Sequence, residues 1–205
     1  MTSKTMPPAD HRAARPTTRK PGFLVTVLLG FLLVFATMTR AANGEVDHLL
    51  QLGIKMFPTL VGGDLELTNQ KNEAGKLLLL VLYQENRTAG EEVLKRLQGS
   101  VQTIYKLPVQ IVLTDPAGLA NFDKQPVAGI FCAEPLSPFP RMVLIKFGLQ
   151  KKSIVFSPFA GEVQQGILSG LHISTQVQPA LNLTTLNAMG MHINPLFFKV
   201  AKTYE

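Results

Sequence analysis

The chain has 205 residues, 46% of them hydrophobic, and this length suits one well-buried domain together with a targeting segment. Its formal net charge of +6 is unevenly placed, because residues 1–41 hold six basic residues against one aspartate, which leaves about +1 for the rest. The positive charge therefore belongs to the amino-terminal segment. The sequence has no basic patch interleaved with aromatic residues, and this absence argues against a nucleic-acid-binding protein.

The amino-terminal segment predicts export. A basic stretch is followed by the apolar run 23–36, which is too short for a membrane span of about 20 residues but suits the core of a signal peptide. A small-x-small site ends at Ala41, so we expect cleavage there, with a signal peptide over 1–41 and an exported domain over 42–205. The alternative is an uncleaved anchor, which would be the chain's only contact with the membrane. No adjacent arginine pair precedes the run, so Sec-type export is preferred.

The first predicted helix lies near residues 47–57. An apolar series there places Leu50, Ile54 and Phe57 on one helical face. Pro58 follows, and because proline lacks a backbone donor and clashes with the preceding turn, we expect it to end or kink this helix.

A β-α-β unit comes next. Seven consecutive apolar residues at 77–83 are typical of a strand buried on both faces in a parallel sheet. Residues 89–105 place apolar side chains on one helical stripe, and residues 108–113 resume strand character, so we expect a right-handed crossover between parallel strands. The stripe consists of Val93, Leu97, Val101 and Ile104.

A second β-α-β unit follows the first. The strand 127–132 ends in Cys132, for which a buried structural thiol is preferred over an intermolecular disulfide or a redox sensor. Residues 134–140 contain three prolines, which exclude regular structure and favour a rigid, exposed loop. A helix over 141–151 then leads into a strand at 153–156.

The last fifty residues have a different pattern. Short apolar runs broken by Gly, Ser and Pro over 154–173 fit two strands and a turn. Thr184 or Thr185 can cap a short helix that closes at Gly190, whose lack of a Cβ suits the residue after a helix.

A terminal helix is expected from Pro195 onward, with Leu196, Val200 and Tyr204 at four-residue spacing. Together the elements predict an α/β fold in a single domain. Its mixed, partly parallel β-sheet would be covered by helices on both faces and would end in a C-terminal antiparallel hairpin and terminal helices.

Three motifs follow one another near the carboxyl terminus. They are an apolar-Asn-apolar triplet at 181–183 that ends a strand, a short helix closing at Gly190, and a helix with an apolar pair before alanine at 197–201. This order resembles the YfiR family of exported bacterial proteins. Residues 52–58 are similar to the first helix of that family, which ends in an aromatic-proline pair after a lysine. The resemblance covers nearly all of the expected domain.

The resemblance implies a periplasmic, non-enzymatic regulator. YfiR-like proteins bind the sensor portion of an inner-membrane diguanylate cyclase, repress cyclic di-GMP synthesis and so control the change to surface-attached growth. They also tend to form homodimers. By this resemblance the chain is expected to bind such a cyclase, or a similar sensor, in the periplasm. Family members can carry paired cysteines, whereas this chain has only Cys132, so disulfide-based control does not carry over.

The expected domain offers little catalytic chemistry. Its three histidines, His48, His172 and His192, are not spaced for a metal site. No nucleophile elbow, Walker loop or Rossmann glycine motif appears either. We therefore expect no catalytic residue, cofactor or metal, and keep an exported enzyme with an unrecognised site as a rival. Glu162, in a glycine-containing turn, is expected to be a solvated carboxylate.

A small-ligand-binding protein of a transport or sensing system is the main alternative. Covered α/β sheets bind molecules at the carboxyl ends of their strands. In this chain a ligand at those ends would meet Asn86, Arg87, Asp115 or Glu134. A closed pocket at those strand ends would favour this alternative.

A protein-binding regulator is expected instead to expose an apolar patch. The proline-rich loop 134–140 offers Leu136 and Phe139 as the candidate partner-binding residues.

Overall fold

The computed structural model describes residues 44–205. The expected signal peptide at 1–41 and the cleavage after Ala41 lie outside the described residues. None of the helices within 44–205 is long and apolar enough to span a membrane. The described residues form an α/β domain with a mixed, mostly parallel sheet, which confirms the predicted fold class.

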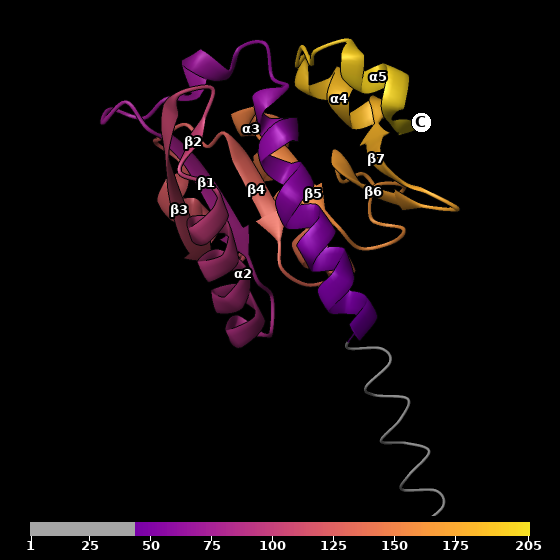
Figure 1. The fold of residues 1–205 in the computed structure, drawn as a ribbon. Helices are drawn as coiled ribbons and strands as arrows, with labels where there is room; N and C mark the ends of the chain where they lie inside the picture. Colours follow the sequence, from indigo (N-terminus) through magenta and orange to yellow (C-terminus); the bar gives the residue numbers. More distant parts are fainter. Residues whose placement is uncertain (1–43) are drawn as a thin grey trace, which may run out of the picture. The chain divides into compact units, whose positions relative to one another are not determined.

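An eight-stranded sheet forms the centre of the domain (Figure 1). Its strands are β1 (Leu77–Leu82), β2 (Thr103–Ile104), β3 (Leu107–Thr114), β4 (Gly129–Cys132), β5 (Ile154–Ser157), β6 (Ser169–Ile173), β7 (Val177–Asn182) and β8 (Lys202–Tyr204). They lie in the order β2-β3-β1-β4-β5-β6-β7-β8. The five strands from β3 to β6 in this order are parallel. β2 runs antiparallel to β3, β7 runs antiparallel to β6, and β8 is parallel to β7.

Helices cover both faces of this sheet. An amino-terminal helix includes residues 44–62. It is followed by η1 (Leu67–Gln70), α2 (Arg87–Ser100), η2 (Gly118–Phe122), α3 (Pro138–Lys151), α4 (Leu183–Met189) and α5 (Leu196–Val200). The crossovers β1-α2-β3 and β4-α3-β5 step in opposite directions along the sheet, so right-handed connections put α2 and α3 on opposite faces (Figure 1). The helix 44–62 shares the α2 face, because Asp47 pairs with Arg96 of α2 at 2.6 Å.

Strand β1 occupies the middle of the parallel part. It pairs with β3 on one side and with β4 on the other, and all six of its side chains are buried. A strand covered on both faces needs an apolar residue at every position, and for this reason the continuous apolar run 77–83 identified it correctly.

Three phenylalanines hold the helix 44–62 against the sheet. Phe57 of the helix, Phe131 of β4 and Phe156 of β5 are fully buried, with ring centroids 5.5 to 5.9 Å apart. Gly129 permits this approach, since a Cβ there would lie 2.7 Å from the Val61 side chain and 2.9 Å from the Phe57 ring. Burying a phenylalanine side chain contributes roughly 1.5 to 3 kcal/mol, so this cluster fixes where the helix docks.

The first helix was expected near residues 47–57 with an end or a kink at Pro58, and the prediction of an end there is wrong, because the helix continues to residue 62. Proline removes one helical hydrogen bond, yet Phe57, Leu60 and Val61 on either side of it are buried against the domain. Tertiary packing of these side chains outweighs the loss of one backbone bond.

The helix predicted over 89–105 ends earlier, at Ser100, and its last residues form β2 instead. A two-residue turn of Tyr105 and Lys106, with φ of 47° and 67°, joins β2 to β3. Ile104 is buried in β2, as it was expected to be on the apolar face of a helix, so the apolar stripe alone did not separate the helix from the strand.

The loop expected over 134–140 is partly helical, because α3 begins at Pro138. Pro138 and Pro140 lie in the first turn of a helix, where backbone N–H groups have no intrahelical partner and proline loses nothing. The prolines therefore do not exclude a helix here, and the loop is shorter than predicted because α3 begins within it.

The carboxyl-terminal region contains the expected antiparallel hairpin, β6 and β7, and a short helix, α4, that ends at Gly190 with φ of 56°. Asn182 caps this helix, its Oδ1 accepting from Thr185 N at 2.8 Å, in place of the expected Thr184 or Thr185. The terminal helix α5 is shorter than predicted. The residues after it form β8, because pairing with β7 satisfies their backbone groups.

Candidate functional site

The carboxyl edge of the parallel strands contains a reversal of strand order. From β1 the chain crosses to β3 on one side, while β4 leads to β5 on the other, so the strand order reverses between β1 and β4. Such a switch point is where open α/β sheets usually bind ligands. The four residues predicted for a ligand all lie at this edge. Asn86 and Arg87 follow β1, Asp115 follows β3 and Glu134 follows β4.

The carboxylate of Glu134, which follows β4, joins the segment that follows β1. Its Oε1 accepts hydrogen bonds from the backbone N–H groups of Gln84, Glu85 and Asn86 at 2.5, 2.8 and 3.0 Å. Three backbone donors that converge on one oxygen form a cradle for an anion. The side chain of the protein itself occupies this cradle.

The other three predicted ligand residues also have local partners. Asn86 caps α2, with its Oδ1 accepting from Ala89 N at 3.0 Å. Arg87 Nε pairs with Glu91 Oε1 at 2.9 Å, and Asp115 Oδ1 accepts from Gly118 N at 2.6 Å. The structure thus brings the four residues to one edge but commits each of them to local structure. A ligand at this edge would have to replace those bonds.

The segment after β4 is tied down from both sides. Ser137 donates from its N and its Oγ to Gln84 Oε1, at 2.8 and 2.9 Å. Leu136 N donates to Glu162 Oε1 at 2.6 Å, and the Leu136 side chain is only 3% exposed. The prediction that Leu136 belongs to an exposed patch is therefore wrong, because Glu162 holds its backbone inside the domain. Phe139 is 71% exposed, as expected, and its partner-binding role stays a prediction.

A buried ion pair lies behind this segment. Arg141 Nη2 lies 3.4 Å from Glu162 Oε1, with the two side chains 13% and 3% exposed. The same Nη2 donates to Leu136 O at 2.5 Å, and Nη1 donates to Gln165 Oε1. Glu162 Oε2 and Arg141 Nε are buried without a hydrogen-bond partner among the residues that the structure describes. The expectation of a solvated Glu162 is wrong, since its charge is held by Arg141 and a backbone donor.

Cys132 lies against this pair and is fully buried, in agreement with the interpretation as a buried thiol. Burial raises the pKa of the thiol well above its ordinary value; the negative charge of Glu162 adds to this rise and the positive charge of Arg141 opposes it. The thiolate form is therefore suppressed, which makes Cys132 a poor nucleophile.

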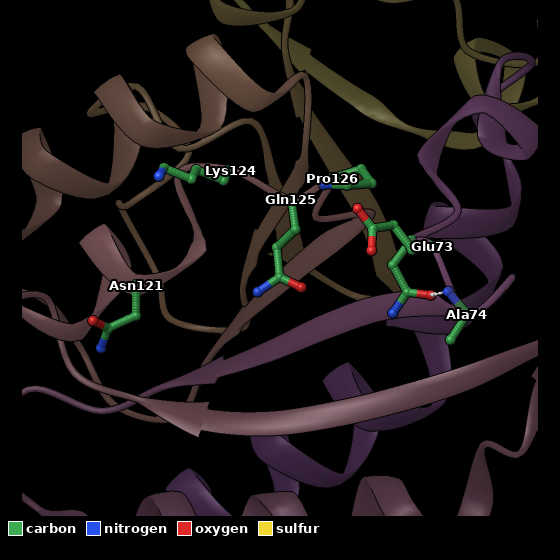
Figure 2. A pocket seen from close by; sticks show the side chains of 7 residues that line it. Glu73, Ala74, Asn121, Lys124, Gln125 and Pro126 are labelled. Carbon is green, nitrogen blue, oxygen red and sulfur yellow. Dashed lines mark hydrogen bonds between the residues drawn. The ribbon is translucent and has the colours of Figure 1, made fainter.

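A second polar region lies at the opposite, amino edge of the strands. A pocket of about 380 Å³ opens there between the loop before β1 and the segment that joins η2 to β4 (Figure 2). The residues that line it are Asn72, Glu73, Ala74, Asn121, Lys124, Gln125 and Pro126. Sequence reasoning missed this pocket because its residues come before strands, where parallel sheets seldom bind ligands.

Hydrogen bonds hold both walls of this pocket, and of the polar lining side chains they engage only that of Asn72 among the described residues. Asn72 Oδ1 accepts from Ala74 N at 3.1 Å and from Lys76 N at 2.9 Å, which fixes the first loop. Lys151 Nζ donates to the backbone oxygens of Asp123 and of Gln125, which fixes the second segment to α3. The pocket is therefore built on two braced turns.

Four polar side chains of the lining have no partner of their own. Within residues 44–205, no hydrogen bond or ion pair engages the side chains of Glu73, Asn121, Lys124 or Gln125. Figure 2 shows Gln125 between Glu73 on one side and Asn121 and Lys124 on the other. Two carboxamides, one carboxylate and one ammonium group are thus available to a ligand.

Among the described residues, no cluster of three or more His, Cys, Asp or Glu side chains is arranged to hold a metal ion. His172 Nδ1 lies 2.9 Å from Tyr204 Oη and His192 Nδ1 lies 3.3 Å from Glu66 Oε1, so these two histidines have structural neighbours.

No protein-family model matches this sequence, and no curated protein matches it. Several solved structures are similar to it, among them these two. One is the ABC domain in complex with L-Trp from Streptococcus pneumonia, with a TM-score of 0.49 and 11% identity over 74% of this chain and 61% of that one. The other is the ligand-free, open structure of a substrate binding protein with adhesive properties from Clostridium difficile, with a TM-score of 0.49 and 12% identity over 75% of this chain and 58% of that one. This chain spans about three fifths of the length of these structures.

Proposed function

We propose that this chain is an exported, non-enzymatic binding protein of a transport or sensing system that holds a small polar ligand at the amino edge of its sheet. The observation that carries the proposal is the pocket of about 380 Å³ with four polar side chains that have no other partner within residues 44–205. Pockets for small molecules begin at about 300 Å³ and fix their ligands with a few convergent polar groups. Export into the periplasm is part of the proposal and is supported by the apolar run 23–36.

Thermal unfolding of the purified full chain tests this proposal. The chain is mixed with free amino acids, short peptides, monosaccharides and nucleosides, one at a time. At least one class is expected to raise Tm, since a ligand at a hundred times its Kd stabilises the folded state by about 2.7 kcal/mol. Ala74→Trp should fill the pocket and abolish the rise, whereas Ala188→Trp, on the exposed side of α4, should leave it. A rise that survives Ala74→Trp would place the ligand elsewhere and contradict the proposal.

A second candidate is the YfiR-like regulator, which would bind the periplasmic part of an inner-membrane diguanylate cyclase, or a similar sensor, and repress cyclic di-GMP synthesis. One observation favours it. Phe139 and Met142 are 71% and 61% exposed and lie three residues apart on one side of α3. Exposed apolar side chains on a braced helix end are typical of a surface for another protein. Homodimer formation belongs to this candidate as well.

An affinity pull-down with the full chain from membranes of its own source tests the second candidate. Recovery of a membrane protein with a diguanylate cyclase domain is expected, and the double variant Phe139→Ser with Met142→Ser should lose it. The matched control is Leu65→Ser, because Leu65 is 62% exposed elsewhere on the surface. Recovery of the same cyclase by the double variant would exclude this surface as the contact. Recovery of transporter subunits, or co-purification of a small molecule, would favour the first candidate.

A further inference from the structure

We infer that the ligand of the amino-edge pocket is a short zwitterionic peptide of about two residues. This inference depends on the proposed ligand-binding function and specifies its chemistry. It follows from the charges, the carboxamides and the apolar surfaces that line the pocket.

The charges of the pocket are opposite and come from its two facing segments. Glu73 lies in the loop before β1 and Lys124 in the segment before β4, and Figure 2 shows them on opposite sides of Gln125. An anion such as a phosphate would be attracted by Lys124 but repelled by Glu73, and a simple cation would be attracted by Glu73 but repelled by Lys124. A molecule with an ammonium group at one end and a carboxylate at the other meets an opposite charge at both ends.

Gln125 and Asn121 suit the middle of such a molecule. A carboxamide donates through its NH₂ group and accepts through its oxygen, which are the complements of the C=O and N–H of a peptide bond. A free amino acid has no peptide bond to use these groups. Gln125 lies between Glu73 and Lys124 in the view of Figure 2, so its carboxamide is one of the groups that such a ligand would meet in the pocket.

Pro126 and Ala74 supply the apolar part of the lining. Their side chains give a small hydrophobic residue of the peptide some surface to cover, without a deep cavity that would select one side chain. A monosaccharide would leave both the carboxylate and the ammonium group without a partner of opposite charge. The lining therefore favours a peptide with small side chains over a sugar.

Isothermal titration calorimetry with the full chain tests the inference, using three probes. They are L-alanyl-L-alanine, its N-acetyl derivative and its carboxy-terminal amide. Each blocked form is expected to bind about fivefold more weakly than the free dipeptide, because an exposed ion pair contributes up to about 1 kcal/mol. The variants Glu73→Gln and Lys124→Met should weaken the free dipeptide by a similar factor.

The decisive result is the coupling between the probes and the variants. In Glu73→Gln, N-acetylation should cost no further affinity, because the partner of the ammonium group is already lost. In Lys124→Met, amidation should cost nothing further for the same reason. The matched controls are Glu92→Gln and Lys95→Met, which remove exposed charges of α2 outside the pocket and should leave all three affinities unchanged.

Failure of this inference is distinguishable from failure of the proposed function. If dialanine does not bind, or binds without the expected coupling, while another compound raises Tm in a manner that Ala74→Trp abolishes, the peptide inference is wrong and the binding function stands. If no compound class raises Tm at all, both are wrong. Glu73 and Lys124 are exposed and their side chains make no hydrogen bond or ion pair within residues 44–205, so their variants are expected to fold as the parent chain does.

Discussion

The polar groups at the two edges of the parallel sheet differ in whether other described residues pair with them. At the carboxyl edge, Glu134 satisfies three backbone donors, and Glu162 pairs with Arg141 and holds the segment after β4. At the amino edge, Glu73 and Lys124 line an open pocket without a partner among the described residues. The edge that usually binds ligands in this fold class is closed by the chain itself, while the less usual edge is left open.

This contrast teaches that the position of a polar residue at a strand end does not by itself indicate a ligand site. A buried or half-buried polar group must be paired, and the nearest loop of the same chain can provide the partner as readily as a ligand can. The groups that remain available are those on braced turns with no neighbour in reach. Four experiments test these assignments, in decreasing order of the change in stability that we expect.

The largest effect is expected at the buried ion pair. Glu162→Ala leaves Arg141 charged and unpaired inside the domain, so we expect the free energy of unfolding to fall by about 3 to 5 kcal/mol. Urea denaturation measures it. Glu73→Ala at the amino edge is the control and should change stability by less than about 0.5 kcal/mol. The double variant Glu162→Met with Arg141→Met should recover much of the loss, and a double variant as unstable as Glu162→Ala would contradict the ion-pair explanation.

The next largest effect is expected at Leu136, which is buried although the sequence predicted an exposed patch of Leu136 and Phe139. Leu136→Ala removes a buried side chain, so we expect a loss of about 2 to 4 kcal/mol in the free energy of unfolding. Phe139→Ala, three residues further on, should change it by less than about 0.5 kcal/mol, because this ring is exposed. Similar losses for the two variants, measured by urea denaturation, would show that both side chains share one environment.

A smaller effect is expected at the anion cradle. Glu134→Gln keeps an acceptor but removes the charge that three backbone N–H groups share, so we expect a loss of about 1 to 2 kcal/mol. Glu92→Gln, on the exposed surface of α2, is the control and should be neutral. If Glu134→Gln is neutral too, the cradle is open to solvent or to another anion, and the carboxyl edge becomes a candidate ligand site again.

The smallest effect concerns Asp64, which follows the helix 44–62. Burial raises the pKa of its carboxyl above the ordinary 3.8, although the N–H of Glu66 donates to it at 2.9 Å and opposes that rise, as do the nearby Lys152 and His192. The folded state therefore binds this proton more tightly than the unfolded chain does. Its contribution to stability is present below pH 3.8 and is lost as the pH rises through the raised pKa.

The variant Asp64→Asn isolates this contribution. The free energy of unfolding of the parent chain minus that of the variant should decrease as the pH rises from 3 to 7, as measured by urea denaturation at each pH. Other carboxyl groups titrate in both proteins and cancel in the difference. An increase over the same range would mean that the hydrogen bond from Glu66, rather than burial, sets the pKa of Asp64.

Much of the scaffold follows from local sequence patterns. The run 77–83 identified β1 because burial on both faces demands apolar residues at every position. The helical stripe of α2 and the short helix α4 closing at Gly190 follow from periodicity and from the backbone freedom of glycine. These features depend on residues within a few positions of one another, so a linear sequence carries them.

Local sequence patterns therefore predict the α/β class, the parallel first part of the sheet, the carboxyl-terminal hairpin and which residues follow each strand. They do not predict which of those residues remain available to a ligand, because this depends on the tertiary structure. Glu134 meets Gln84 across 50 positions and Glu162 meets Leu136 across 26, and both contacts depend on how distant loops meet at one edge of the sheet. The physical reason is that a polar group is free or committed according to its neighbours in space, which local periodicity does not specify.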